Sequence, residues 1–393
     1  MQPRGTEPMS IRGAAYVAGI YEHPGRDLPT HTIWDIHTEV AMGALADAGL
    51  SMGDVDALFC DGTAGFGVLT LCDHFGIRPK YVDSTETGGS SYLAHVGHAA
   101  AAIAAGKCSV ALITLAGKPR TGSPPVQWAQ GPESGFESVW GMAGAPHSYA
   151  LAAQRHMYEF GTTSAQLAEI KVAASTHAQY NSNAFLKNVV TVDEVLNSPL
   201  VADPLHRLDC CVVTDGGGAL VVVSPEIAKK LGKTQAKVLG HGEAVKHTNN
   251  GRIDLTYTGA VWSGPLAFEE AGVSVADIDY ASIYDSFTIT VLQTIEDLGF
   301  CEKGKGGEFV MDGALIAPFG RLPFNTDGGG LSNNHPSNRG GITKVIEAVR
   351  QLRGEAHPAV QVPDCQIALA HGTGGSLGSR HGSVTLILGQ HDA

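Results

Sequence analysis

The chain has 393 residues, of which 43% are hydrophobic and 17% charged, and a formal net charge of −13. That charge argues against nonspecific nucleic-acid binding, which requires a basic surface, and no apolar run reaches the roughly 20 residues that span a bilayer. No basic segment followed by an apolar core opens the chain, and the seven cysteines show no zinc-ligand spacing, so we expect a reduced, cytoplasmic protein.

The first half predicts strands that alternate with helices. The expected strands are 14–20, 55–60 and 109–115, and the expected helices are 33–48 and 89–105. Alternation of this kind predicts a largely parallel sheet with helices on both faces. Residues 116–209 then interrupt the pattern. They begin with a segment rich in Gly, Pro and Ser and continue with helices at 151–160 and 164–180. A long insertion on a rigid scaffold usually serves binding.

The second half repeats the alternation. It predicts a helix that ends at 271, strands at 280–284 and 367–370, and helices at 287–298 and 341–352. Letters match as well: Ala48-Gly49-Leu50-Ser51 precedes Asp54, and Ala271-Gly272-Val273-Ser274 precedes Asp277, at an offset of 223 residues. The chain therefore contains two copies of one α/β unit.

Five motifs in the same order resemble those of the thiolase superfamily. Asn334-His335-Pro336 stands where thiolases have Gly-His-Pro, and Asn325–Gly330 resembles their Asn-x-x-Gly-Gly stretch. The others are Cys210–Val223, which resembles the segment ending the thiolase loop domain, and Tyr284-Asp-Ser-Phe-Thr288 and His371-Gly-Thr-Gly-Gly375, which resemble the sterol-carrier-protein class. The resemblance covers nearly the whole chain. It implies a thiolase fold, with two duplicated α/β halves in a five-layer αβαβα sandwich and an inserted loop domain.

The resemblance also implies domain boundaries. The N-terminal half is expected at 11–115, completed by 210–230; the loop domain is expected at 116–209 and the C-terminal half at 235–393.

Both thiolase cysteines are missing. Thr85 occupies the nucleophile position, Ser286 the position of the second cysteine, with Tyr284 in place of the motif's His, and His371 the corresponding position in the last turn. A threonine hydroxyl is far less acidic than a thiol, so a covalent acyl-enzyme on Thr85 is disfavoured. Claisen cleavage of a 3-ketoacyl-CoA needs such a nucleophile. Retro-aldol cleavage of a 3-hydroxyacyl-CoA needs only a base, an oxyanion hole and an acid.

The pattern is most similar to that of thiolase-like aldolases of steroid side-chain degradation. They also lack the nucleophilic cysteine, and they cleave a 3-hydroxyacyl-CoA to a ketone and a shorter acyl-CoA. They carry tyrosine where this chain has Asn334-His335-Pro336. The resemblance implies a coenzyme A thioester substrate, a homodimer formed through the first half, and a zinc-ribbon/OB-fold partner protein. No metal or redox cofactor of the chain's own is expected, with zinc only in the partner.

Three residues are predicted to be catalytic. Tyr284 is the candidate acid/base, with a buried core tyrosine as the alternative. His335 is the candidate donor to the thioester oxygen, with a structural turn histidine as the alternative. His371 could relay protons or line the oxyanion hole, or it could be structural.

Five further residues are predicted to line the substrate pocket: Thr85, Ser286, Asp285, Asn334 and Gly374. For Asp285, capping of the following helix is the favoured interpretation. His95 and His98 lie three residues apart on a predicted helix without a third ligand, so no metal site is predicted.

Two other functions remain open. One is an acetyl-CoA acetyltransferase that uses an unusual nucleophile. The other is a catalytically silent subunit that binds acyl-CoA.

Overall fold

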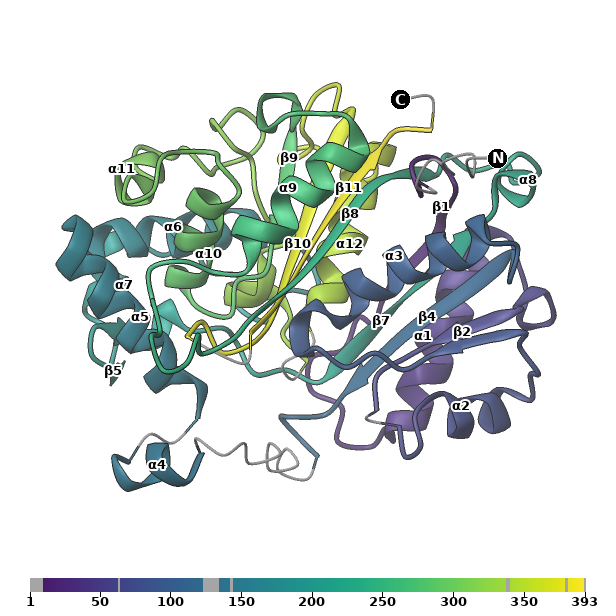
Figure 1. The fold of residues 1–393 in the computed structure, drawn as a ribbon, viewed down its shortest axis with the longest axis horizontal. Helices are drawn as coiled ribbons and strands as arrows, with labels where there is room; N and C mark the ends of the chain where they lie inside the picture. Colours follow the sequence, from purple (N-terminus) through teal and green to yellow (C-terminus); the bar gives the residue numbers. More distant parts are fainter. Residues whose placement is uncertain are drawn as a thin grey trace, which may run out of the picture.

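The computed structural model describes residues 10–62, 64–122, 134–141, 144–336, 340–378 and 381–391. Within them, one twisted sheet runs through both halves in the order β3-β2-β4-β7-β1-β8-β11-β10-β9 (Figure 1). Its strands are β1 (Tyr16–Glu22), β2 (Ala57–Phe59), β3 (Tyr81–Asp83), β4 (Val110–Gly117), β7 (Gly216–Val223), β8 (Ala236–Lys246), β9 (Tyr280–Ile283), β10 (Ile367–Gly375) and β11 (His381–Gly389).

The helices form three layers around two groups of strands. The outer helices of the first half are α1 (Ile33–Ala48) and α2 (Val68–Phe75), which pack on one face of β2, β4 and β7. The central helices, α3 (Ser91–Ala104) and α12 (Gly341–Arg353), share one core with strands of both halves. The outer helices of the second half are α9 (Ala260–Ala271), which packs on β8 and β11, and α10 (Thr288–Asp297), which packs against α9. The five-layer αβαβα architecture is therefore confirmed.

The internal repeat is visible in matching caps. α1 starts with a capping box at Thr32 and ends at Gly49 with φ 71°, and α9 ends at Gly272 with φ 65°. A Ser-capped 3₁₀ turn follows each helix, η1 (Met52–Asp54) and η4 (Val275–Asp277). Left-handed glycines end helices because they have no Cβ to clash. The same local sequence signals thus produce the same helix end and 3₁₀ turn in both halves.

The expectation of a largely parallel sheet is wrong. Parallel pairing joins β2 to β3 and β4, and β9 to β10, whereas β1, β7, β8 and β11 pair antiparallel with their neighbours. The chain passes from β7 to β8 through only the short helix α8 (Pro225–Ala228), and β11 follows β10 after five residues. The five-residue connection from β10 to β11 is too short for the crossover that parallel strands require. β7 and β8 do not pair with each other, because both pair antiparallel with β1, which lies between them.

The insertion supplies most of the remaining elements. They are α4 (Ser134–Val139), α5 (Ala145–Phe160), α6 (Ser164–Ala178), α7 (Val192–Leu196), β5 (Leu200–Ala202), β6 (Leu205–His206) and η3 (Arg207–Asp209). Parts of the Gly- and Pro-rich segment, 123–133 and 142–143, lie outside the described residues. Figure 1 shows α5, α6 and α7 on the side of the molecule that carries α10, away from α1 and α2.

Two short elements complete the second half: α11 (Gly306–Phe309) and a π-helical turn, η5 (Gly329–Asn333). No helix among the described residues is long and apolar enough to cross a membrane.

Candidate active site

Besides the pairing of β1 with β8, the two halves approach each other closely through backbone at a second place, which we call the junction. The segment after β3 forms η2 (Gly88–Ser90), which lies against the end of β10 and the start of α12. A β-carbon on Gly374 would overlap the carbonyl oxygen of Thr87, and one on Gly341 would overlap that of Gly89. Only glycine permits such close approach of backbones. The predicted residue Gly374 thus shapes the site through its missing side chain.

Tyr284 and His335 lie side by side at this junction. Tyr284 follows β9, is buried, and its backbone N–H donates to the His371 carbonyl at 2.9 Å. Its ring centroid lies 5.4 Å from that of His335, at an interplanar angle of 61°. A β-carbon on Gly89 would overlap the phenol end of Tyr284. The tyrosine therefore lies between His335 and the segment that carries Thr85.

His335 is a buried, neutral imidazole. Desolvation lowers the pKa of His335 to about 4, although the charge of Asp285 opposes the shift. Its backbone N–H donates to Thr214 Oγ1 at 2.9 Å, and its Nε2 has no hydrogen-bond partner among the described residues. A buried ring nitrogen without a partner is costly unless a ligand satisfies it. His335 can therefore offer one nitrogen to a substrate atom.

Asp285 supports the turn that leads to His335 and does not cap the following helix, α10, so the capping interpretation is wrong. α10 begins at Thr288 without a side-chain cap. The Asp285 carboxylate instead accepts from the backbone N–H groups of Gly330 at 2.8 Å and Leu331 at 3.1 Å, and from Lys344 Nζ at 2.9 Å. Burial disfavours the ammonium of Lys344, but Asp285 and other nearby carboxylates outweigh burial and raise its pKa.

Thr85 is held as a hydrogen-bond donor. Its hydroxyl donates to Asp83 Oδ1 at 2.7 Å, and its backbone N–H donates to the same oxygen at 2.8 Å. Burial opposes ionisation of Asp83, yet hydrogen bonds from His98 and Thr85 hold the pKa of that carboxyl well below its usual range. A carboxylate that holds its proton so weakly is a poor base. His95 contacts the Thr85 carbonyl oxygen, at 3.0 Å, and not its hydroxyl.

Ser286 lies on the loop-domain side of the site. Its hydroxyl is 3.2 Å from Thr290 Oγ1 and also bonds Tyr149 of α5. The Tyr149 hydroxyl donates to the Gly375 carbonyl at 3.2 Å, and burial raises the pKa of Tyr149 to about 12. The sequence offered no signal for Tyr149, which reaches the site from the insertion. Cys211 adjoins Ser286 through its backbone N–H, and burial raises the pKa of its thiol.

The other predicted side chains are turned to internal partners. Asn334 donates to Glu22 Oε1 at 2.9 Å and accepts from Thr214 Oγ1 at 2.8 Å. His371 Nδ1 lies 3.0 Å from Thr385 Oγ1, beneath α9, on the opposite face of β10 from the junction. Desolvation lowers the pKa of His371 to about 3. The structure therefore does not bring the His371 side chain to Tyr284 and His335.

One group of possible metal ligands occurs among the described residues, and it excludes His95 and His98. It consists of His23, His31 and Glu39. Gly25 N–H donates to His23 Nδ1, so the proton of that ring is on Nε2, which lies 2.6 Å from Glu39. This tautomer presents a donor, not a lone pair, to the group.

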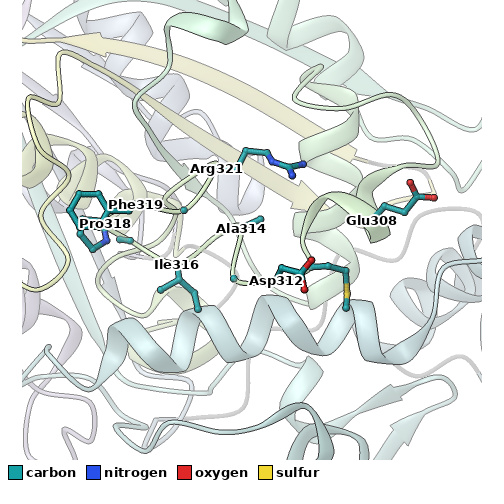
Figure 2. A pocket seen from close by; sticks show the side chains of 11 residues that line it. Glu308, Asp312, Ala314, Ile316, Pro318, Phe319 and Arg321 are labelled. Carbon is teal, nitrogen blue, oxygen red and sulfur yellow. The ribbon is translucent and has the colours of Figure 1, made fainter.

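Two cavities lie away from Tyr284 and His335. One of about 470 Å³ is open to the surface and is lined by residues of the segment 308–321, with Phe319 and Pro318 on one side and Glu308 on the other (Figure 2). The second, of about 700 Å³, lies between α3, β8 and α9. Neither contains a residue of the junction.

Known proteins are similar to this chain over most of its length. Residues 242–390 match the family model "Thiolase C-terminal domain-like". An acetyl-CoA acetyltransferase of Methanothermobacter thermautotrophicus is 32% identical over 88% of this chain and 94% of the relative. A steroid side-chain-cleaving aldolase of Thermomonospora curvata is 33% identical over 88% of this chain and 91% of the relative. The solved structure "Ltp2-ChsH2(DUF35) aldolase" has a TM-score of 0.89 at 31% identity, covering 98% of this chain and 100% of that one.

Proposed function

The chain belongs to the thiolase superfamily, and on that basis we propose that it cleaves, or forms, the C2–C3 bond of a 3-hydroxyacyl-CoA by aldol chemistry, without a covalent acyl-enzyme. The observation that carries this proposal is the state of residue 85. Its hydroxyl donates to an ionised carboxylate, and no imidazole among the described residues forms a hydrogen bond with it. A hydroxyl becomes a nucleophile only when a base accepts its proton.

Retro-aldol cleavage has three steps. A base removes the proton of the 3-hydroxyl, and the C2–C3 bond breaks to leave a carbonyl compound. The electron pair of the broken bond forms the enolate of the shorter thioester, which an acid then protonates at C2. Neutral His335 donates a hydrogen bond to the thioester oxygen, where negative charge develops. Tyr284, whose ring lies against His335, is the acid/base group. His371 contributes through its carbonyl, which accepts the Tyr284 backbone N–H.

An acetyltransferase reaction is the second candidate, and the Methanothermobacter relative favours it. That reaction requires an acyl group on the enzyme. The thiol of Cys211, the cysteine next to Ser286, is disfavoured as its carrier because burial raises its pKa. A silent acyl-CoA-binding subunit is a third possibility, and it predicts binding without turnover.

The assembly is also proposed. The similar solved structure, the Ltp2-ChsH2(DUF35) aldolase, carries a DUF35 protein in its name, which supports a zinc-ribbon/OB-fold partner for this chain. β3 ends the sheet order, and its central residue, Val82, is 44% exposed. A free strand edge can pair with a second copy, which supports a homodimer through the first half. Coenzyme A enters as the substrate thioester, and zinc belongs to the partner.

The test compares 3-hydroxyacyl-CoA and 3-ketoacyl-CoA substrates, including steroid side-chain thioesters, with and without the candidate partner. Mass spectrometry follows both the products and the intact protein. We expect a ketone or aldehyde plus a shorter acyl-CoA from the hydroxy substrates, without free CoA and without an acyl adduct. Cleavage of keto substrates alone, dependent on free CoA and with an adduct, would establish the acyltransferase. Binding without turnover would establish the silent subunit.

A further inference from the structure

The π-helical turn η5, which leads to His335, is held in place by hydrogen bonds to other segments of the chain. η5 is fully buried and enters through two glycines with positive φ, Gly328 at 96° and Gly329 at 60°. Asp285 takes two of its N–H groups, as described above. Its carbonyl groups are taken by other segments: Val212 N–H donates to Gly330 O at 2.9 Å, and Leu186 N–H donates to Ser332 O at 2.8 Å. The turn therefore depends on its neighbours for its conformation.

Lys171, on α6 of the insertion, makes the one side-chain ammonium contact to this turn among the described residues. Its Nζ donates to the Leu331 carbonyl at 2.7 Å and to Ser332 Oγ at 2.7 Å. The residue is only 1% exposed. Lys344 lies behind Asp285 and reaches the turn only through that carboxylate. The two lysines thus secure the same turn at its carbonyl side and its N–H side.

A lysine buried in this way is costly. Lysine is almost never fully buried unless it is paired, and Lys171 forms no ion pair within 4 Å among the described residues. Burial lowers the pKa of Lys171 to about 8, although Asp285 and Asp209 oppose the shift. Its ammonium donates to a carbonyl and a hydroxyl of one turn. Burial of this lysine therefore fixes the position of that turn.

We infer that Lys171 is a positioning residue for His335: through Leu331 and Ser332 it transmits the placement of the loop domain to the turn that carries the imidazole. The catalytic part of this inference rests on the proposed function. Displacement of a catalytic group by about 1 Å can cost about 100-fold in rate. The loop domain therefore contributes to the chemistry without touching the reacting atoms.

The test compares Lys171→Met with Lys246→Met in the 393-residue chain, with and without the candidate partner. Lys246 is a matched control, because it is also buried and its ammonium also donates to two carbonyls, those of Asp254 and Tyr257. Two readouts are used: hydrogen exchange of peptides that cover 328–336, and kcat and KM for the substrate that wild type turns over. We expect Lys171→Met to speed exchange in 328–336 and to lower kcat about 10- to 100-fold with KM within about threefold. Lys246→Met should leave both unchanged.

Each outcome decides the inference. Unchanged exchange in 328–336, or the same loosening in both variants, overturns it. Retained kcat overturns its catalytic part. If wild type turns over no thioester, the proposed function fails, while the exchange comparison still tests the role of Lys171 in the turn. If Lys171→Met does not fold, Lys171→Gln replaces it, because glutamine keeps a neutral donor there.

Discussion

Lys344→Met leaves the Asp285 carboxylate without its direct ion-pair partner. Both side chains are buried, and the pair is 2.9 Å apart. Removing one partner of a buried pair typically costs about 3–5 kcal/mol, because the other charge stays desolvated. Two backbone N–H groups still bind Asp285, and Lys171 still contributes favourable charge, so we expect the lower end, about 3 kcal/mol.

A double-mutant cycle isolates the pair. Lys344→Met, Asp285→Asn and the double variant are unfolded in urea at pH 7, and their free energies of unfolding are compared at matched m values. We expect the double variant to lose at least about 2 kcal/mol less than the sum of the single variants, because it buries no unpaired partner of this pair. Additivity within about 0.5 kcal/mol would refute the coupling and leave Asp285 only its backbone bonds.

Three further outcomes are expected. His335→Gln should lower kcat about 100- to 1,000-fold while the thioester Kd changes little, because one oxyanion donor is lost; kcat within threefold of wild type would contradict that role. Tyr284→Phe should lower kcat by about 100-fold or more with an unchanged circular dichroism spectrum, and retained turnover would place the acid/base group elsewhere. Hydrogen bonds to Asp83 and Glu243 raise the pKa of His98 to about 10, so its stabilisation is full below about pH 6.5 and is lost as pH rises toward 10. His98→Asn should remove this alkaline decline in Tm, and identical Tm profiles would count against the ion pairs.

The sequence predicted the positions of helices and strands better than it predicted how the strands pair. The helix at 33–48 was placed to the residue, because Thr32, Asp35 and Gly49 are local signals. Strand direction is not a local property. β1, β7 and β8 pair with strands that lie far away along the chain, and among the antiparallel pairs of the large sheet only β10 and β11 are consecutive in sequence, so a pattern of alternation alone could not reveal the strand directions.

In the candidate site, too, the sequence predicted some features correctly and missed others. Tyr284 and His335 are adjacent in space, as motifs in a fixed order suggested. His371 shows the limit of such reasoning, since side chains alternate across a strand and a shift of one residue reverses the face. Gly372 faces the junction and His371 does not. Asp285 was misread because its partners, Gly330 and Lys344, come from 45 and 59 residues further along the chain.

The bond between Thr85 and Asp83 also bears on whether cysteine chemistry could be introduced at position 85. Thr85→Cys would place a thiol where the hydroxyl now donates to an ionised carboxylate. A neighbouring negative charge raises the pKa of a thiol and reduces its thiolate fraction at neutral pH. A reactive thiol at this place therefore needs substitutions at both 85 and 83, and a variant with only the cysteine gains no active nucleophile.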